Sequence, residues 1–179
     1  MATFLAGAQR AVRRTLGCQT EDGGFPFLDS SGITINYTSL VLWCLLNLLD
    51  VLPESARRSL ADPEQLALAV DRACGFLRES EAPDGSLLWE QRETSTAKYN
   101  LWTYLITANV LFRHGTDADR GIAERLLGSA FSRRTAGGLL PMRDRGEEIT
   151  ACAFMQADML LFLLPWLPIQ ARSGRTPAP

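Results

Sequence analysis

Apolar and polar positions recur with helical periodicity along most of the chain, and this pattern predicts six helices and almost no strand. The predicted helices cover residues 3–17, 34–52, 63–80, 94–114, 117–133 and 147–167. Asp62 can cap the third helix and Pro63 suits its first position, whereas Gly115 can end the fourth. We therefore expect a helical protein with short connections.

The helices are of two alternating kinds. In the third helix Leu66, Val70, Ala73 and Leu77 recur on one face, so the other face is solvated, and the first and fifth helices are similarly amphipathic. The second, fourth and sixth helices are apolar nearly all round, as in SLVLWCLLNLL, LWTYLITANVLF and AFMQADMLLFLL. A helix of that kind must be buried on all sides. The alternation predicts an all-α fold of three α-hairpins in a two-layer arc.

A glycine turn lies between the two helices of each hairpin. The three turns read Asp22-Gly23-Gly24-Phe25, Asp84-Gly85-Ser86-Leu87 and Ala136-Gly137-Gly138-Leu139. Tyrosine follows the turn aspartate by 15 residues in both of the first two hairpins, and asparagine follows it by 25. Turns rich in Asp and Gly combined with this register indicate an internal repeat.

Two stretches carry a resemblance to a known superfamily. CQTEDGGFPF followed by INYTSLVLWCLLNLL, and EAPDGSLLWE followed by KYNLWTYLITANVLF, resemble repeats of the squalene–hopene cyclase and protein prenyltransferase superfamily. Gln19 to Phe25 is similar to that superfamily's Gln…Gly-x-Trp turn, with Phe in place of Trp. The resemblance spans roughly residues 3 to 165 and implies half of an α/α toroid, whose inner helices surround an apolar cavity for isoprenoid chains.

The chain lacks the catalytic motifs of the superfamily it resembles. It has no DxDD acid motif, no aspartate-rich DDxxD run and no Asp, Cys, His set for zinc, since His114 is the only histidine. The sequence also contains no GxSxG, P-loop, GxGxxG or HExxH motif. We therefore expect no metal and no cofactor.

Aligning the inner helices through Gly23, Gly85 and Gly137 places their residues at common levels. The levels hold Tyr37, Tyr99 and Ala151; then Leu40, Trp102 and Phe154; then Cys44, Ile106 and Asp158; and finally Asn47, Asn109 and Leu161. Steps of three and four residues keep these positions on one helical face. The face is a candidate cavity lining in which Trp102, Phe154, Cys44, Ile106, Asn47, Asn109 and Leu40 contact substrate.

Asp158 is the main catalytic candidate, because a carboxylate inside an apolar helix either pairs with a cation or stays protonated. A protonated acid in an apolar cavity can serve as a general acid, whereas an ion pair with an arginine would be structural. Tyr99 and Tyr37 either polarise the substrate or pack in the core. The asparagines either contact substrate or bridge helices. His114, at a helix end, is expected to be structural.

These residues favour a small cofactor-independent cyclase that folds a long apolar or polyene substrate, terpenoid or polyketide, in natural-product biosynthesis. The alternative is a non-catalytic half-toroid that binds an apolar ligand or a partner protein. Three hairpins leave both ends of the arc uncovered, so we expect a homodimer.

Composition limits the remaining possibilities. The chain has 179 residues, 46% hydrophobic and 21% charged, with a formal net charge of −2, which fits one folded domain over 1–167 and a flexible tail over 168–179. The charge balance gives no reason to expect nucleic acid as a partner. No apolar run reaches the roughly 18 residues of a membrane span. Four widely spaced cysteines without a CxxC pair favour reduced thiols and a cytoplasmic location.

Overall fold

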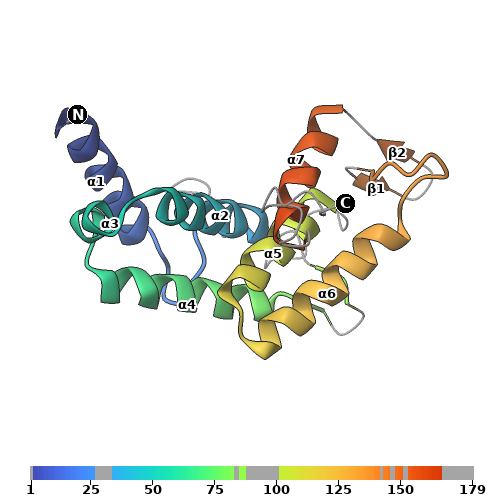
Figure 1. Ribbon diagram of the computed structural model, residues 1–179. Coiled ribbons are helices and arrows are strands. Elements are labelled where there is room, and N and C mark those ends of the chain that lie inside the picture. The colour runs from blue at the N-terminus through green and yellow to red at the C-terminus, as the bar shows by residue number, and fades with distance from the viewer. Residues whose placement is uncertain are drawn as a thin grey trace, which may run out of the picture.

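The computed structural model describes residues 2–26, 34–82, 85–87, 101–141, 143–145, 148–150 and 153–166. These residues form an all-α fold with one short antiparallel ribbon (Figure 1). The elements in chain order are α1 (Ala2–Gly17), α2 (Ile35–Val51), α3 (Glu54–Leu60), α4 (Pro63–Glu79), α5 (Leu101–His114), α6 (Asp117–Ser132), β1 (Arg143–Arg145), β2 (Glu148–Thr150), α7 (Ala153–Leu163) and a final 3₁₀ turn, η1 (Leu164–Trp166).

Most helix ends follow from local sequence. Asp62 caps α4 by accepting a hydrogen bond from the Glu64 amide, with Pro63 in the first turn, as predicted. Gly115 ends α5 with a φ of +87°, a value that favours glycine and also confirms the prediction. Thr34 and Thr116 cap α2 and α6 through their hydroxyl oxygens.

Two segments differ from the predicted helices. Residues 148–150, predicted to be helical, pair instead with 143–145, in keeping with the β-branched side chains of Ile149 and Thr150, and α7 begins only at Ala153. The short helix α3 follows Pro53 and was not predicted. Helix α5 is described from Leu101, so the predicted start at 94–100, like the predicted tail, lies outside the described residues.

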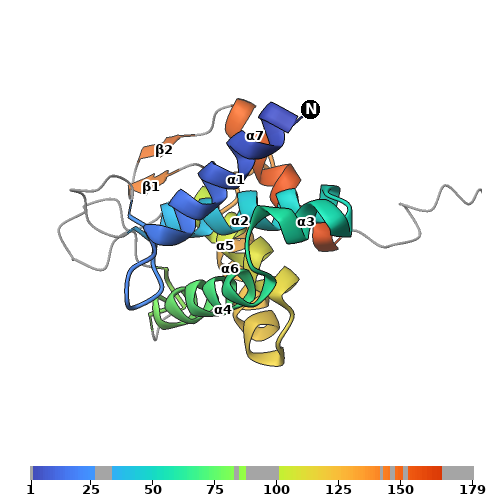
Figure 2. The same ribbon diagram turned by 90° about the vertical axis from the view of Figure 1, so that its left-hand side faces the viewer.

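Of the predicted hairpins, α4 with α5 pairs directly, whereas the main helical neighbour of α1 is α3 and that of both α6 and α7 is α5. Helix α5 contacts α2 on one side and α7 on the other, and α4 and α6 contact it from the second layer. Figure 2 shows α4 and α6 below α1, α2 and α3. Helix α1 joins through a smaller cluster in which Val12 packs with Leu45. The inner layer is therefore α2, α5 and α7, with α5 at its centre.

Burial on all sides, predicted for every inner helix, holds only for α5. From Thr103 to Leu111 every residue of α5 is buried. Helix α7 instead leaves Leu160 66% and Leu161 47% exposed. The prediction was wrong for α7 because only one of its sides has a helical neighbour among the described residues.

The three turns share one hydrogen-bond pattern. In the turns that begin at Thr20, Ala82 and Thr135, the first amide donates to the carbonyl four residues on, and the fourth amide donates back to the first carbonyl. The fourth residue is Gly23, Gly85 or Gly138, each with a positive φ. The internal repeat predicted from the sequence is therefore present in the backbone.

The register of the third repeat is one residue from the predicted one. Gly138, not Gly137, holds the positive-φ position, so the third turn follows the first by 115 residues rather than 114. This shift moves Asp158 and Leu161 off the common levels and puts Met159 and Phe162 there. Both are almost fully buried, and Phe162 accepts a hydrogen bond from Asn109, its counterpart on α5.

Candidate ligand-binding site

A groove opens between α2, α5 and the α7–η1 segment, with a volume of about 520 Å³. We call it the inner groove. Its wall has an apolar part, made by α7 and η1 with one tryptophan, and a polar part, made by α2 and α5. The lining residues are Trp43, Asn47, Asp50, Asn109, Arg113, Leu161, Leu164 and Pro165.

Arg113 organises the polar part of the inner groove. Its Nη1 donates to Asn47 Oδ1 at 2.9 Å and its Nη2 donates to Asp50 Oδ2 at 2.8 Å. The Arg113 side chain is 15% exposed and that of Asp50 is 73% exposed. Burial lowers the pKa of Arg113, with Asp50 acting in the opposite direction, and a guanidinium remains charged in proteins. The groove thus has a half-buried cation held in a fixed position.

Asn109 contributes a polar atom without a protein partner. The residue is 2% exposed, and its Nδ2 donates to the Phe162 carbonyl at 2.6 Å. Its Oδ1 is buried and accepts no hydrogen bond from the described residues. An unsatisfied buried acceptor costs about 1–3 kcal/mol, so the site favours a bound group that can donate to it.

Aromatic contacts hold the Phe162 ring next to this asparagine. The Phe162 ring lies edge-on to Trp43 at 5.4 Å and to Trp102 at 5.2 Å between ring centroids. Such edge-to-face pairs hold ring orientation as well as burying area. The carbonyl that receives the Asn109 amide is therefore on a rigid residue, which fixes the direction of Asn109 Oδ1.

The predicted site residues divide between groove and core. Of the predicted site residues, Asn47 and Asn109 line the inner groove together. Ile106 is fully buried, Leu40 and Trp102 pack against the core, Cys44 is exposed, and Tyr37 and Asp158 are partly exposed. None of these six lines the groove. Tyr99 and the Phe154 side chain lie outside the described residues.

The sequence analysis missed Trp43, Asp50 and Arg113 as groove residues. The basic residues of α5 are Arg113 and His114, which end the helix. Arg113 follows Asn109 by four positions, so both side chains lie on one helical face. That spacing was visible in the sequence. The partner residue Asp50 lies at the end of α2, beyond the levels that the repeat defined.

A second polar cluster lies on the opposite side of the carboxyl end of α5. Asp119, fully buried, receives hydrogen bonds from Arg78 Nη1 at 2.7 Å, from the Thr116 hydroxyl and from His114 Nδ1. His114 Nε2 also contacts Asp71 at 2.8 Å. We call these five residues the α4–α6 cluster. It joins α4, α5 and α6, which supports the structural role predicted for His114.

The charges of the α4–α6 cluster stabilise one another. Burial alone would lower the pKa of His114, but its hydrogen bonds to Asp119 and Asp71 outweigh it and raise the pKa. Burial alone would raise the pKa of Asp119, but Thr116, His114 and Arg78 lower it overall. Burial, with Asp119 and Asp71, raises the pKa of nearby Cys74 to about 12. A thiol of that kind is a poor nucleophile.

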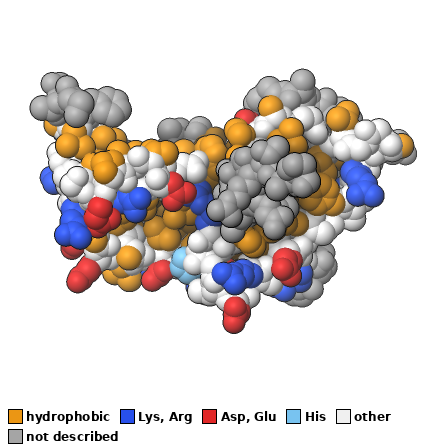
Figure 3. Space-filling view, viewed as in Figure 1, with side chains coloured by type: hydrophobic (Ala, Val, Ile, Leu, Met, Phe, Trp, Pro, Cys, Tyr) orange, Lys and Arg blue, Asp and Glu red, His pale blue; other side chains and the backbone are white. Residues whose placement is uncertain are grey.

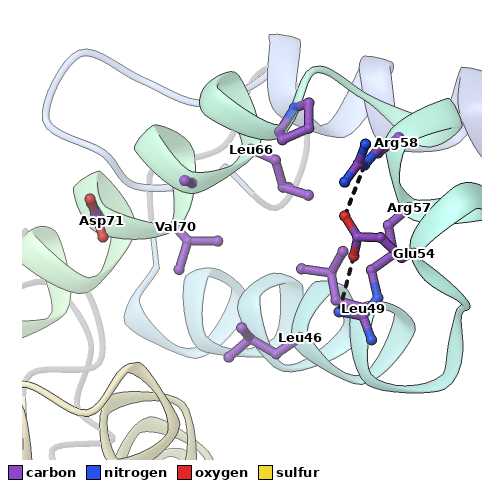
Figure 4. Close-up of a pocket in the computed structure, with 10 residues that line it drawn as sticks. Leu46, Leu49, Glu54, Arg57, Arg58, Leu66, Val70 and Asp71 are labelled. Carbon is purple, nitrogen blue, oxygen red and sulfur yellow. Dashed lines mark hydrogen bonds and ion pairs between the residues drawn. The ribbon is translucent and has the colours of Figure 1, made fainter.

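A second cavity of about 330 Å³ lies between α2, α3 and α4 (Figure 4). Leu46 and Leu49 of α2 face Leu66 and Val70 of α4 across it. Its charged rim is already paired: Arg58 Nε donates to Glu54 Oε1 at 3.0 Å, and Arg57 Nε donates to the Leu52 carbonyl at 2.8 Å. The inner groove is the better candidate, because it alone joins a partnerless buried acceptor to a fixed cation.

The described residues hold no group of three or more His, Cys, Asp or Glu side chains arranged for a metal ion. Within the same part of the chain, no helix is both long and apolar enough to cross a membrane. No protein-family model, no curated protein and no solved structure matches the chain. The assignment of function therefore rests on the geometry of the inner groove.

Proposed function

We propose that the protein binds a small, mainly apolar molecule with one polar end in the inner groove. The observation that carries this proposal is Asn109, a lining residue of this groove whose buried Oδ1 has no partner among the described residues. The volume of about 520 Å³ falls within the range of small-molecule sites.

The polar groups indicate what the end of the ligand carries. Asn109 needs a donor, and Arg113, which has five N–H groups, can donate to an acceptor beside it. A hydroxyl group does both at once. A long-chain or polyene alcohol, with its chain along Trp43, Leu161 and Leu164, fits this arrangement.

Binding and catalysis are separate proposals for this groove. Asp50 is the only carboxylate among its described lining residues, and it is paired with Arg113. Asp158, the predicted general acid, does not line the groove. Cyclisation of a polyene therefore stays a prediction, and ligand binding is the function that the geometry supports best. A reducing, cytoplasmic location is part of the proposal, since Cys18, Cys44 and Cys74 are free thiols.

The test compares farnesol with farnesene, which has a similar polyene chain but no hydroxyl group. Tryptophan fluorescence of the full chain is followed during titration with each compound, because Trp43 lines the groove. We expect farnesol to bind about tenfold more tightly, as one hydrogen bond to a buried acceptor predicts. Asn109→Leu should abolish this preference and leave farnesene binding unchanged.

Thr107→Val is the matched control. Thr107 is also a buried polar residue of α5, but its hydroxyl lies 2.7 Å from that of Ser39 and does not line the groove. This variant should keep the preference for farnesol. Equal binding of the two compounds to the unmodified protein, or an unchanged preference in Asn109→Leu, would contradict the proposal.

A further inference from the structure

An arginine occupies the same repeat position in the helix that precedes each of the three turns, α1, α4 and α6. Arg10, Arg72 and Arg125 each lie ten residues before the first residue of their own turn, at Thr20, Ala82 and Thr135. Arg72 of α4 donates to the Thr20 and Glu21 carbonyls at 2.9 and 2.7 Å. Each outer helix can therefore attach to the turn of the preceding hairpin through this arginine.

The next junction repeats the contact with a different acceptor. Arg125 of α6 donates through Nε and Nη2 to both carboxylate oxygens of Glu81, at 2.8 and 2.7 Å. Glu81 immediately precedes the second turn, as Gln19 precedes the first. Two of the three arginines are thus engaged by turns within the chain.

The first helix and the third turn each lack a partner for this contact among the described residues. Arg10 of α1 is exposed and makes no hydrogen bond or ion pair with the described residues. The third turn, which begins at Thr135, receives no outer-helix arginine from the part of the chain that the structure describes. One end therefore has the arginine without a turn, and the other has a turn without the arginine.

The end that holds the third turn is also the apolar end. Seven large hydrophobic side chains among the described residues are exposed, and five of them belong to α6, the third turn, α7 and η1. They are Phe131, Leu139, Leu160, Leu161 and Leu164. In Figure 3, hydrophobic side chains reach the surface in the region where Figure 1 places α7. Exposed apolar side chains concentrated in one part of the chain are typical of an interaction surface.

We propose that a second copy of the chain docks head-to-tail on this end, with its α1 against the third turn. Its Arg10 then donates to the carbonyls of the third turn, as Arg72 does at the first. The occupant is a second copy because α1 of this chain is the helix that carries the arginine at the repeat position. Leu161 and Leu164 also line the inner groove, so self-association is measured on the ligand-free protein.

Charge at the junction gives the proposal a specific test. Arg134 stands where Gln19 and Glu81 stand in the other repeats, and α1 carries Arg10, Arg13 and Arg14. The docked copies therefore bring like charges together, which weakens the contact and is relieved by salt. Arg134→Glu recreates the glutamate of the second junction and should pair with Arg10 of the second copy as Glu81 pairs with Arg125.

The experiment measures self-association of the full chain by sedimentation equilibrium. We expect the 19.7 kDa chain to form dimers and longer head-to-tail assemblies, with tighter association at higher salt. Arg134→Glu should lower the dissociation constant about fivefold at low salt, the upper range for an exposed ion pair. Adding Arg10→Ala should remove that gain, and Leu160→Glu should dissociate the dimer.

Arg120→Glu is the matched control, because it makes the same charge change at an exposed position of α6 away from the third turn. It should not tighten the dimer. A monomer at high micromolar concentration would overturn the proposal. So would a dimer that Leu160→Glu dissociates but that responds equally to Arg134→Glu and Arg120→Glu, since that result indicates a two-fold contact between α7 helices.

Discussion

Helix α5 ends between two polar regions of opposite character. On one side the α4–α6 cluster surrounds the buried Asp119 with three side-chain donors. On the other side the inner groove leaves the buried Asn109 Oδ1 without a donor from the described residues. Polar groups buried equally deeply can therefore serve stability where they are satisfied and mark a binding site where they are not.

The comparison predicts its largest effect at Asp119. Asp119→Ala leaves Arg78 and His114 without their shared carboxylate, and breaking a buried ion pair is costly because a charge stays behind. Since Arg78 is partly exposed, we expect a loss of about 3 kcal/mol in the free energy of unfolding, measured with urea. Asp117→Ala, an exposed change in the same helical turn, should cost less than about 0.5 kcal/mol. If the two variants lost equal free energy of unfolding, the buried α4–α6 cluster would have no special role in stability.

The first glycine turn is packed tightly against α4. Gly23 has a φ of +95°, and a Cβ atom there would lie 2.3 Å from the Arg72 carbonyl oxygen of α4. Gly85 has a φ of +74° with no atom near its Cβ position. Gly85→Ala should therefore cost about 1 kcal/mol, from backbone strain alone, and Gly23→Ala about 2 kcal/mol more. Urea unfolding of both variants measures the difference, and equal costs would show that the first turn is not packed against α4.

Protonation of His114 should make the stability of the α4–α6 cluster depend on pH. The pKa of His114 is raised on folding, so its contribution is complete below the unfolded pKa of about 6.5 and is lost as pH rises through the folded value. The pKa of Asp119 is lowered, so its contribution is present above its unfolded pKa of about 3.9 and is lost as pH falls through the folded value. The cluster is therefore most stabilising in mildly acidic solution.

The variant His114→Gln separates the pH dependence of stability due to His114 from that due to Asp119. The variant should be less stable than the unmodified protein by about 1 kcal/mol at pH near 5, because a neutral amide cannot pair with two carboxylates. The gap should close as pH rises above the folded His114 pKa. Urea unfolding at a series of pH values measures it, and a gap that is constant over that range would assign His114 to packing alone.

The repeat in the sequence predicted the three turns and two residues of the site, and an error of one residue in the third repeat misplaced Asp158. Asn47 and Asn109 were found because the first two repeats align without a gap, and both line the groove. Asp158 was misplaced because two adjacent glycines, Gly137 and Gly138, fit the third turn equally well in sequence, and only the backbone φ tells them apart.

The sequence did not predict which polar side chains pair between distant helices. Nothing local indicates that Arg113 pairs with Asp50, 63 residues away, or that Asp119 is fully buried although it begins an amphipathic helix. Helical periodicity reports which face is apolar, and it does not report which polar residues of other elements meet that face.

Asn109→Leu gives the smallest expected effect on stability and the sharpest use of the comparison. The change removes the unsatisfied Oδ1 and adds apolar surface, but it also deprives the Phe162 carbonyl of its donor. These contributions oppose one another, so the free energy of unfolding without ligand should change by less than about 1 kcal/mol. Urea unfolding of the ligand-free protein measures it, beside Asp119→Ala. A loss as large as that of Asp119→Ala would mean that Asn109 is satisfied in the folded protein, and that both sides of α5 serve stability alone.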